Sequence, residues 1–187
     1  MNVVHINARA VAGGAARACN RLHAGLREAG HASRVLTREP VPGSDEFFLA
    51  RRDGPLWRML AEMNIRAERW SGLNGLLAPQ AWSVDRSHFD WADVVTLHNL
   101  HGYYFSLYLL PRIERRAPLV WMLSDMWALT GRCACPMDCE GWLSGCRPCP
   151  RPSAYPPARW DNSALAFRMK ARIYRPVSYT HLRAHET

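Results

Sequence analysis

Short apolar runs alternate with amphipathic stretches along most of this chain, and this alternation constrains its fold more than any other feature. Residues 2–6 are mostly apolar, a loop with Gly13 and Gly14 follows, and apolar residues then recur at helical spacing as far as Gly30. A second apolar run covers about residues 31–36. Strand, glycine turn, helix and strand make a βαβ unit, and the two strands of such a unit are predicted to be parallel.

The same alternation continues through the middle of the chain. Residues 39–53 have the composition of a loop, and residues 55–77 form an aromatic-rich amphipathic stretch that predicts one or two helices with an exposed basic side. The remaining predicted elements are buried strands over 92–97 and 118–123 and helices over 105–116 and 163–174. We therefore predict an α/β fold, a Rossmann-like open parallel sheet with helices on both faces, whose ligands bind outside the carboxyl ends of the strands.

Composition narrows the class of protein. The 187 residues are 48% hydrophobic and 21% charged, which is typical of a globular chain rather than a disordered one. There is no apolar run of about 18 residues that would span a membrane, and the first residues do not resemble a secretion signal, so we expect a cytoplasmic protein. The net charge of +8 comes almost wholly from arginine and favours polyanionic partners: anionic lipid headgroups, nucleotide phosphates or nucleic acid.

A glycine pair follows the first predicted strand. Backbone N–H groups of Gly13 and Gly14, at the start of a helix, can approach an anion closely, and Arg17 in the first turn could add a cation. The chain has neither the dinucleotide fingerprint nor the P-loop pattern. The alternative is a tight turn without a ligand.

Two further polar clusters follow later strands. His98, Asn99, His101 and Gly102 form a loop that suits recognition of sugar hydroxyls, unless one histidine only caps a helix and the other is solvated. The second cluster runs from Ser124 through Asp125 to Trp127. Its carboxylate can accept hydrogen bonds from hydroxyls and its indole can stack on a sugar face. The alternative is that Asp125 is a helix N-cap and Trp127 a core residue.

Cysteines are concentrated in one irregular, proline-rich loop. Four thiolates at this spacing can close a tetrahedral structural zinc site, and the predicted ligands are Cys133, Cys139, Cys146 and Cys149. Cys135 could replace Cys133. Reduced buried thiols and oxidised pairs are the alternatives to zinc. Cys19 lies apart from this loop and is predicted to be a buried helix residue.

Together these clusters resemble the N-terminal half of bacterial family 4 glycosyltransferases of the colanic-acid or exopolysaccharide type. The most specific matches are HNLHGYYFS and the run from Trp121 to Pro150, which joins DMW, TG and the cysteines. Further matching stretches are VVHINARAVAGGAARACNRLHAGLREAGHASRVL, LLAPQAWSVD and ALAFRMKARIYR. The resemblance spans nearly all of residues 1–176.

The resemblance implies a GT-B fold of two Rossmann-like domains. The N-terminal domain would mainly hold a saccharide or lipid-linked acceptor, and the C-terminal domain would hold the nucleotide-sugar donor. It also implies retaining transfer without a required catalytic metal, so that any zinc would be structural, and a glycine pair near the donor diphosphate. Ser124 and Asp125 match the catalytic loop. Where the family usually has Leu-His-Asp-Met-Trp, Ser124 replaces a histidine expected to face the reacting sugar, and the resemblance implies that restoring histidine raises transfer.

The predicted organisation is one acceptor-side domain, residues 1–176, with a Cys-rich insertion at about 131–150. The donor-binding domain is expected beyond this chain, which would be inactive alone. Residues 177–187 fit neither the arginine bias nor any periodicity and resemble a translated sequencing adaptor, so we expect a non-native tail with few contacts. A peripheral contact with the anionic inner face of a membrane is a further expectation. The alternatives are a zinc-stapled basic module that binds nucleic acid, for which no recognition helix is evident, and a non-catalytic scaffold.

Overall fold

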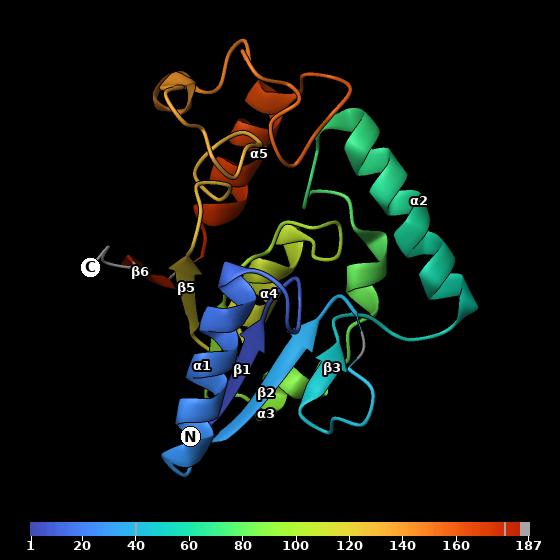
Figure 1. Cartoon of the computed structure of the whole chain (residues 1–187), viewed down its shortest axis with the longest axis vertical. Coiled ribbons are helices and arrows are strands. Elements are labelled where there is room, and N and C mark those ends of the chain that lie inside the picture. The colour runs from blue at the N-terminus through green and yellow to red at the C-terminus, as the bar shows by residue number, and fades with distance from the viewer. Residues whose placement is uncertain (40, 178, 184–187) are drawn as a thin grey trace.

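A parallel sheet lies at the centre of the fold (Figure 1). The computed structural model describes residues 1–39, 41–177 and 179–183. The strands are β1 (Asn2–Ile6), β2 (Ala32–Thr37), β3 (Phe47–Leu49), β4 (Val94–Leu97), β5 (Leu119–Leu123) and β6 (Tyr179–Arg183). Their order is β3-β2-β1-β4-β5-β6, and every pair is parallel. The predicted α/β fold with an open parallel sheet is confirmed.

Helices cover both faces of this sheet. The α-helices are α1 (Gly14–Glu28), α2 (Pro55–Ser71), α3 (Ser87–Trp91), α4 (Leu110–Glu114) and α5 (Ser163–Tyr174). Short 3-10 helices cover Pro79–Ser83, Leu107–Leu109 and Gly141–Ser144. Figure 1 shows α1 in front of the sheet and α3 and α4 behind it. Within the described residues, no helix combines the length and the apolarity needed to cross a lipid bilayer.

The two central strands are buried from both sides. Val4 on β1 and Val95 on β4 are completely buried, and Ile6 and Leu97 at the ends of these strands are almost as inaccessible. A parallel strand covered by helices on both faces needs apolar residues at successive positions, not only at alternate ones. This requirement explains why the two strands appear in the sequence as short continuous apolar runs.

Several elements differ from the sequence-based expectation, and α3 and the 3-10 helix Pro79–Ser83 had no predicted counterpart. The predicted loop 39–53 contains β3, a three-residue edge strand that is too short to produce a detectable alternation. The predicted helix 105–116 is a 3-10 turn followed by the short helix α4, with Pro111 in its first turn. Proline is compatible with that position because its missing N–H has no intrahelical partner there.

The expectation that the tail makes few contacts is wrong for β6. This strand pairs with β5 over five positions, from Leu119 opposite Tyr179 to Leu123 opposite Arg183. The other edge of β5 pairs with β4, and the backbone groups that β5 offers on the β6 side can pair with any extended segment, since β-pairing does not require particular side chains. The assignment of residues 177–187 as a non-native tail stays a prediction, and residues 178 and 184–187 lie outside the described part of the chain.

The Cys-rich segment and α5 lie beyond the carboxyl ends of the strands (Figure 1). Arg132 holds this segment together because its buried guanidinium donates hydrogen bonds to three backbone carbonyls, those of Arg151, Ala154 and Pro156, at 2.6–3.0 Å. A buried guanidinium bonded to several carbonyls can replace the hydrogen bonds that regular secondary structure would provide. Nε of Arg132 has no hydrogen-bond partner among the described residues.

Gly131 is required where this segment meets α5. A Cβ at Gly131 would overlap the carbonyl group of Ser163, whereas a Cβ at Gly25, within α1, would meet nothing within 4 Å. We expect Gly131→Ala to lower the free energy of unfolding by about 1–3 kcal/mol, and Gly25→Ala to raise it by about 0.5–1 kcal/mol. Urea unfolding of both variants measures this difference, and equal stabilities would contradict the described packing.

Candidate functional site

The three polar clusters predicted from the sequence lie at one edge of the sheet. They follow β1, β4 and β5, which are neighbours in the strand order. Because all these strands are parallel, their carboxyl ends meet at the same edge. The prediction that the clusters share one rim is therefore confirmed as a matter of geometry.

A cavity of about 370 Å³ joins the first two clusters. Gly13 and Gly14 contribute from the start of α1, and Asn99, His101 and Gly102 contribute from the loop after β4. Gly13 has φ +102°, which only glycine adopts without strain, and it is the N-cap residue of α1. The first N–H groups of α1 have no intrahelical acceptors, so this end of the cavity favours a negative charge.

Arginines line the same cavity. Arg9, Arg38 and Arg69 are part of its wall, and none of the described lining residues is Asp or Glu. Arg17, the cation predicted from the sequence, is exposed and does not line the cavity. Its place is taken by arginines from three other segments. Arg38 directly follows β2, so the rule that ligands bind at strand ends could have identified it, but nothing in the sequence indicated Arg9 or Arg69.

His101 connects the cavity to the third cluster. Its Nε2 lies 2.9 Å from Oδ2 of Asp125, and its ring packs against Tyr155 with ring centroids 5.2 Å apart. An ionised carboxylate only accepts hydrogen bonds, so this contact places the imidazole proton on Nε2. Nδ1 of His101 is then an acceptor, and it is buried without a hydrogen-bond partner among the described residues. The pair therefore has the arrangement of an oriented general base.

Ser124 and Asp125 line a much narrower pocket beside this cavity, together with Trp127. Trp127 is only 1% exposed and belongs to the hydrophobic core, so a sugar face has no access to its ring. Trp127 is therefore a core residue, as the alternative interpretation expected. The expectation that its indole stacks on a sugar face is wrong for this structure. Asp125 also accepts a hydrogen bond from the backbone N–H of Trp127 at 2.9 Å, which fixes the turn after β5.

His98 is likewise inaccessible to a ligand in the main cavity. It is 2% exposed, and its Nε2 lies 3.2 Å from Nδ1 of His5. Burial lowers the pKa of His98 to about 4, and burial together with the neighbouring imidazoles lowers that of His5 to about 3. Both rings are therefore neutral at ordinary pH. Cys19 is completely buried on α1, as predicted, and burial raises the pKa of its thiol to about 12.

Lys170 connects α5 to the turn after β5, which contains Ser124, Asp125 and Trp127. Its Nζ donates to the carbonyls of Trp127 at 2.6 Å and Thr130 at 3.2 Å, and it lies 3.7 Å from the centroid of the Trp127 ring. Burial lowers the pKa of Lys170 to about 7. It is the only lysine in the chain. Sequence reasoning missed its role, because neither its position on α5 nor its neighbours indicated that it would be buried.

The four cysteines predicted as zinc ligands line a common pocket with Trp142. All six cysteines of the chain are free thiols, and Sγ of Cys146 accepts a hydrogen bond from the backbone N–H of Gly131 at 3.0 Å. Across the described residues, only His5, Cys19 and His98 bring three potential metal-binding atoms within 4.8 Å of one another. The sulfurs of the Cys-rich loop thus converge without reaching the spacing of about 4 Å that zinc requires, and zinc binding there stays a prediction.

Comparison with known proteins supports the interpretation of the motifs. The chain is 31% identical over 191 aligned residues to a protein of Escherichia coli (strain K12), WcaC, whose name assigns it provisionally to colanic acid biosynthesis as a glycosyl transferase. This chain is a relative of a colanic acid glycosyltransferase. The resemblance inferred from the motifs is confirmed by an alignment that covers 95% of the chain.

The same alignment covers 46% of the relative, so the chain spans about half the length of the glycosyltransferase that it matches. No protein-family model matches the chain, and no solved structure matches it significantly.

The lowered pKa of Lys170 predicts a pH dependence of stability. The folded-state pKa of about 7 lies below the ordinary value of 10.5, so the folded state binds fewer protons than the unfolded state between these pH values. The free energy of unfolding of the wild type, relative to that of Lys170→Met, should therefore rise with pH from about 7 to 10.5, with a slope of up to about 1.4 kcal/mol per pH unit. Urea unfolding of both proteins across this range measures the slope. A difference that does not change with pH would show that Lys170 is not buried as described.

Proposed function

We propose that this chain is the acceptor-side domain of a GT-B glycosyltransferase of exopolysaccharide assembly. The reaction is retaining transfer of a sugar from a nucleotide-sugar donor to a saccharide or lipid-linked acceptor. One observation carries the proposal: His101 lines the same cavity as the glycine turn and, at 2.9 Å, also contacts Asp125. One cavity is therefore lined both by a turn suited to a diphosphate and by a histidine suited to accept a proton.

The positive end of the cavity suits the donor diphosphate. Arg9, Arg38, Arg69 and the first residues of α1 line the cavity, and arginine binds phosphate oxygens in a bidentate manner. As the leaving diphosphate gains negative charge, the same groups stabilise it more strongly. This arrangement supports transfer that needs no catalytic metal, since the protein's own cations face the charge that develops.

The other end of the cavity suits the acceptor. Nδ1 of His101 is buried in this chain, so an acceptor hydroxyl reaches it only after the residues that cover the ring move. It then accepts the hydroxyl proton while the Asp125 carboxylate orients the ring and stabilises the imidazolium. Ser124 precedes Asp125 and can donate or accept a hydrogen bond but cannot take up a proton at neutral pH. We therefore assign the proton-accepting role to His101 and a hydroxyl-binding role to Ser124.

Turnover would require a second domain. The greater length of the relative supports a donor-binding domain that follows this one in the natural protein, and the nucleotide-sugar would be held between the two. This chain alone should bind parts of the substrates without transferring sugar. Structural zinc in the Cys-rich loop remains part of the proposal, supported by the common pocket of the four thiols.

A peripheral contact with an anionic membrane is also proposed. One face of α2 exposes large apolar side chains, each 53–56% accessible, at a spacing of three, four and seven residues: Leu56, Met59, Met63 and Trp70. Exposed arginines such as Arg66 lie beside this stripe. An apolar stripe with basic neighbours is typical of helices that lie on lipid surfaces. No specific observation on the described residues favours the nucleic-acid-binding or scaffold alternatives.

Arg9 and Arg17 offer a matched test of the diphosphate end. Both side chains are exposed, but only Arg9 lines the cavity. We expect Arg9→Gln to weaken binding of inorganic pyrophosphate about tenfold, as loss of one charge-assisted hydrogen bond predicts, and Arg17→Gln to leave it within about twofold. Calorimetric titration of this chain measures both affinities. Equal losses in the two variants, or no pyrophosphate binding by the wild type, would exclude the assigned diphosphate site.

The acceptor end is tested in a longer protein in which a donor domain of the proposed kind follows this chain. His101→Gln retains a side-chain donor toward Asp125 but removes the base, so transfer should fall about 10²-fold or more. Ser124→Ala should reduce transfer much less. If instead the parent is inactive and Ser124→His creates activity, the proton acceptor belongs at position 124 and the role given to His101 is wrong.

A further inference from the structure

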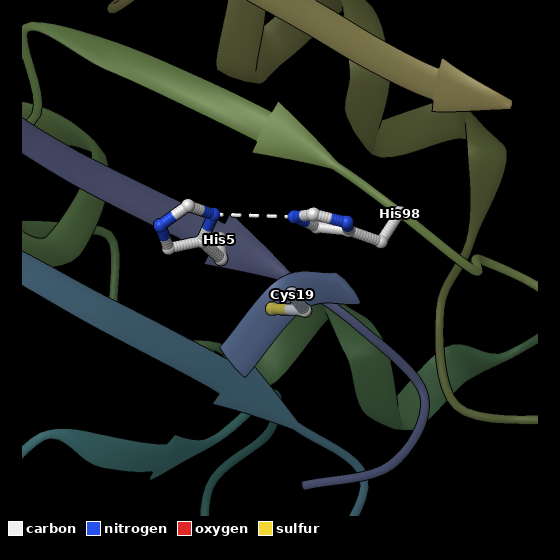
Figure 2. Close-up of side chains that lie close together, drawn as sticks. All are labelled: His5, Cys19 and His98. Atoms are coloured by element: carbon white, nitrogen blue, oxygen red, sulfur yellow. Dashed lines mark hydrogen bonds between the residues drawn. The ribbon is translucent and has the colours of Figure 1, made fainter. Parts of the chain in front are cut away.

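Three buried side chains with metal-binding atoms meet behind the candidate site (Figure 2). His5 lies on β1, His98 directly follows β4, and Cys19 lies on α1, where it packs against the sheet. All three are at most 2% exposed. Figure 2 shows Nδ1 of His5 facing Nε2 of His98, with the Cys19 thiol close to both rings. We call these residues the buried triad.

The spacing of the buried triad approaches that of a metal site. The two facing nitrogens are 3.2 Å apart. Nitrogens bound at about 2.0–2.1 Å would be about 3.3 Å apart on a tetrahedral ion and about 3.5 Å apart on an ion with three ligands in a plane. The three ligand atoms all lie within 4.8 Å of one another. A nitrogen and a thiolate sulfur on the same ion would be about 3.5 Å apart, so closure requires Sγ to move by no more than about 1.3 Å.

The hydrogen bond between the two histidines uses only one nitrogen of each ring. One proton satisfies one nitrogen of each ring, while His5 Nε2 and His98 Nδ1 are buried without a hydrogen-bond partner among the described residues. When the facing nitrogens bind an ion, these outer nitrogens carry the ring protons, so the ion uses only the lone pairs of the facing pair.

Charge decides which ion fits. A buried charge without a partner is costly, and no carboxylate belongs to the group of potential ligands that the structure brings together here. One thiolate and two neutral imidazoles carry a charge of −1, so a monovalent ion makes the site neutral while a divalent ion leaves +1 in the core. Thiolate and imidazole are also the ligands that soft ions prefer.

We propose that His5, Cys19 and His98 form a structural site for one copper(I) ion that ties α1 to the centre of the sheet. On binding, the S–H bond of Cys19 breaks and its proton is released to solvent. The proton held between the two facing histidine nitrogens moves to the outer nitrogen of its own ring, and a Cu–S bond and two Cu–N bonds form. No electron is transferred. The ion would fix α1 against β1 and β4 directly behind the glycine turn, and the site is separate from the glycosyltransferase proposal.

The experiment is an anaerobic titration of the protein with copper(I) in competition with a chromogenic copper(I) chelator. Thiols of the Cys-rich loop also bind copper(I), so the main measurement uses a background in which Cys133, Cys135, Cys139, Cys146 and Cys149 are all replaced by serine. We expect about one equivalent of copper(I) and a raised melting temperature in this background. Adding Cys19→Ala or His98→Gln should abolish both effects. His88→Gln is the matched control, because His88 is a buried histidine that packs against Phe48 and is not part of the triad, and it should change neither.

The wild-type chain provides a second measurement if the serine background does not fold. Cys19→Ala should then lower the copper(I) stoichiometry by one equivalent without removing the copper held by the loop. Undiminished stoichiometry in Cys19→Ala, or equal losses in His98→Gln and His88→Gln, would overturn the proposal. A titration with zinc in place of copper(I) tests the charge argument, and tighter binding of zinc to the triad would refute the assignment of a monovalent ion.

Discussion

The parallel pairing of β1 with β4 at the centre of the sheet determines most of what this structure can do. The chain leaves β1 toward β2 on one side, and later returns to place β4 on the other side. The loops after these two strands therefore diverge over opposite faces and leave a crevice between them. The glycine turn and the His98–Gly102 loop occupy this crevice. Both strands are buried from two sides, so any change that separates them would expose the most apolar part of the chain.

Beyond the sheet, irregular segments are fixed by buried basic side chains rather than by regular secondary structure. Arg132 donates hydrogen bonds to carbonyls of the Cys-rich segment, and Lys170 donates to carbonyls of the turn after β5. Burying the Arg132 cation is costly, but the carbonyl oxygens offset much of that cost, whereas Lys170, whose pKa burial lowers to about 7, loses its charge above that pH. Both anchors act on the backbone, so they fix the loop conformation and leave most of the loop side chains free to vary.

The sequence predicted the fold well because each main strand and helix carries its own periodic signal. α5 was predicted at its observed bounds, and β1, β2, β4 and β5 within two residues. Placing the polar clusters on one rim required only the rule that parallel strands end at the same edge. The arginines of the cavity were not predictable in this way, because Arg69 reaches it from the last turn of α2, a contact that depends on how α2 packs. For the same reason Arg17 was chosen wrongly: a helix start indicates where an anion binds, but not which side of the helix faces it.

His101 brings an imidazole close to Ser124, although the two residues follow different strands of the sheet. The resemblance to glycosyltransferases implies a histidine at position 124, after β5. His101, in the loop after β4, belongs to the stretch HNLHGYYFS, which itself matches the family, and its contact with Asp125 brings an imidazole to the turn that contains Ser124. An acceptor hydroxyl needs a proton acceptor at a suitable distance, whichever strand carries it. The carboxylate next to Ser124 is thus positioned to orient the imidazole of His101. Serine at 124 is therefore compatible with catalysis under the proposed function, provided that Nδ1 of His101 faces the acceptor.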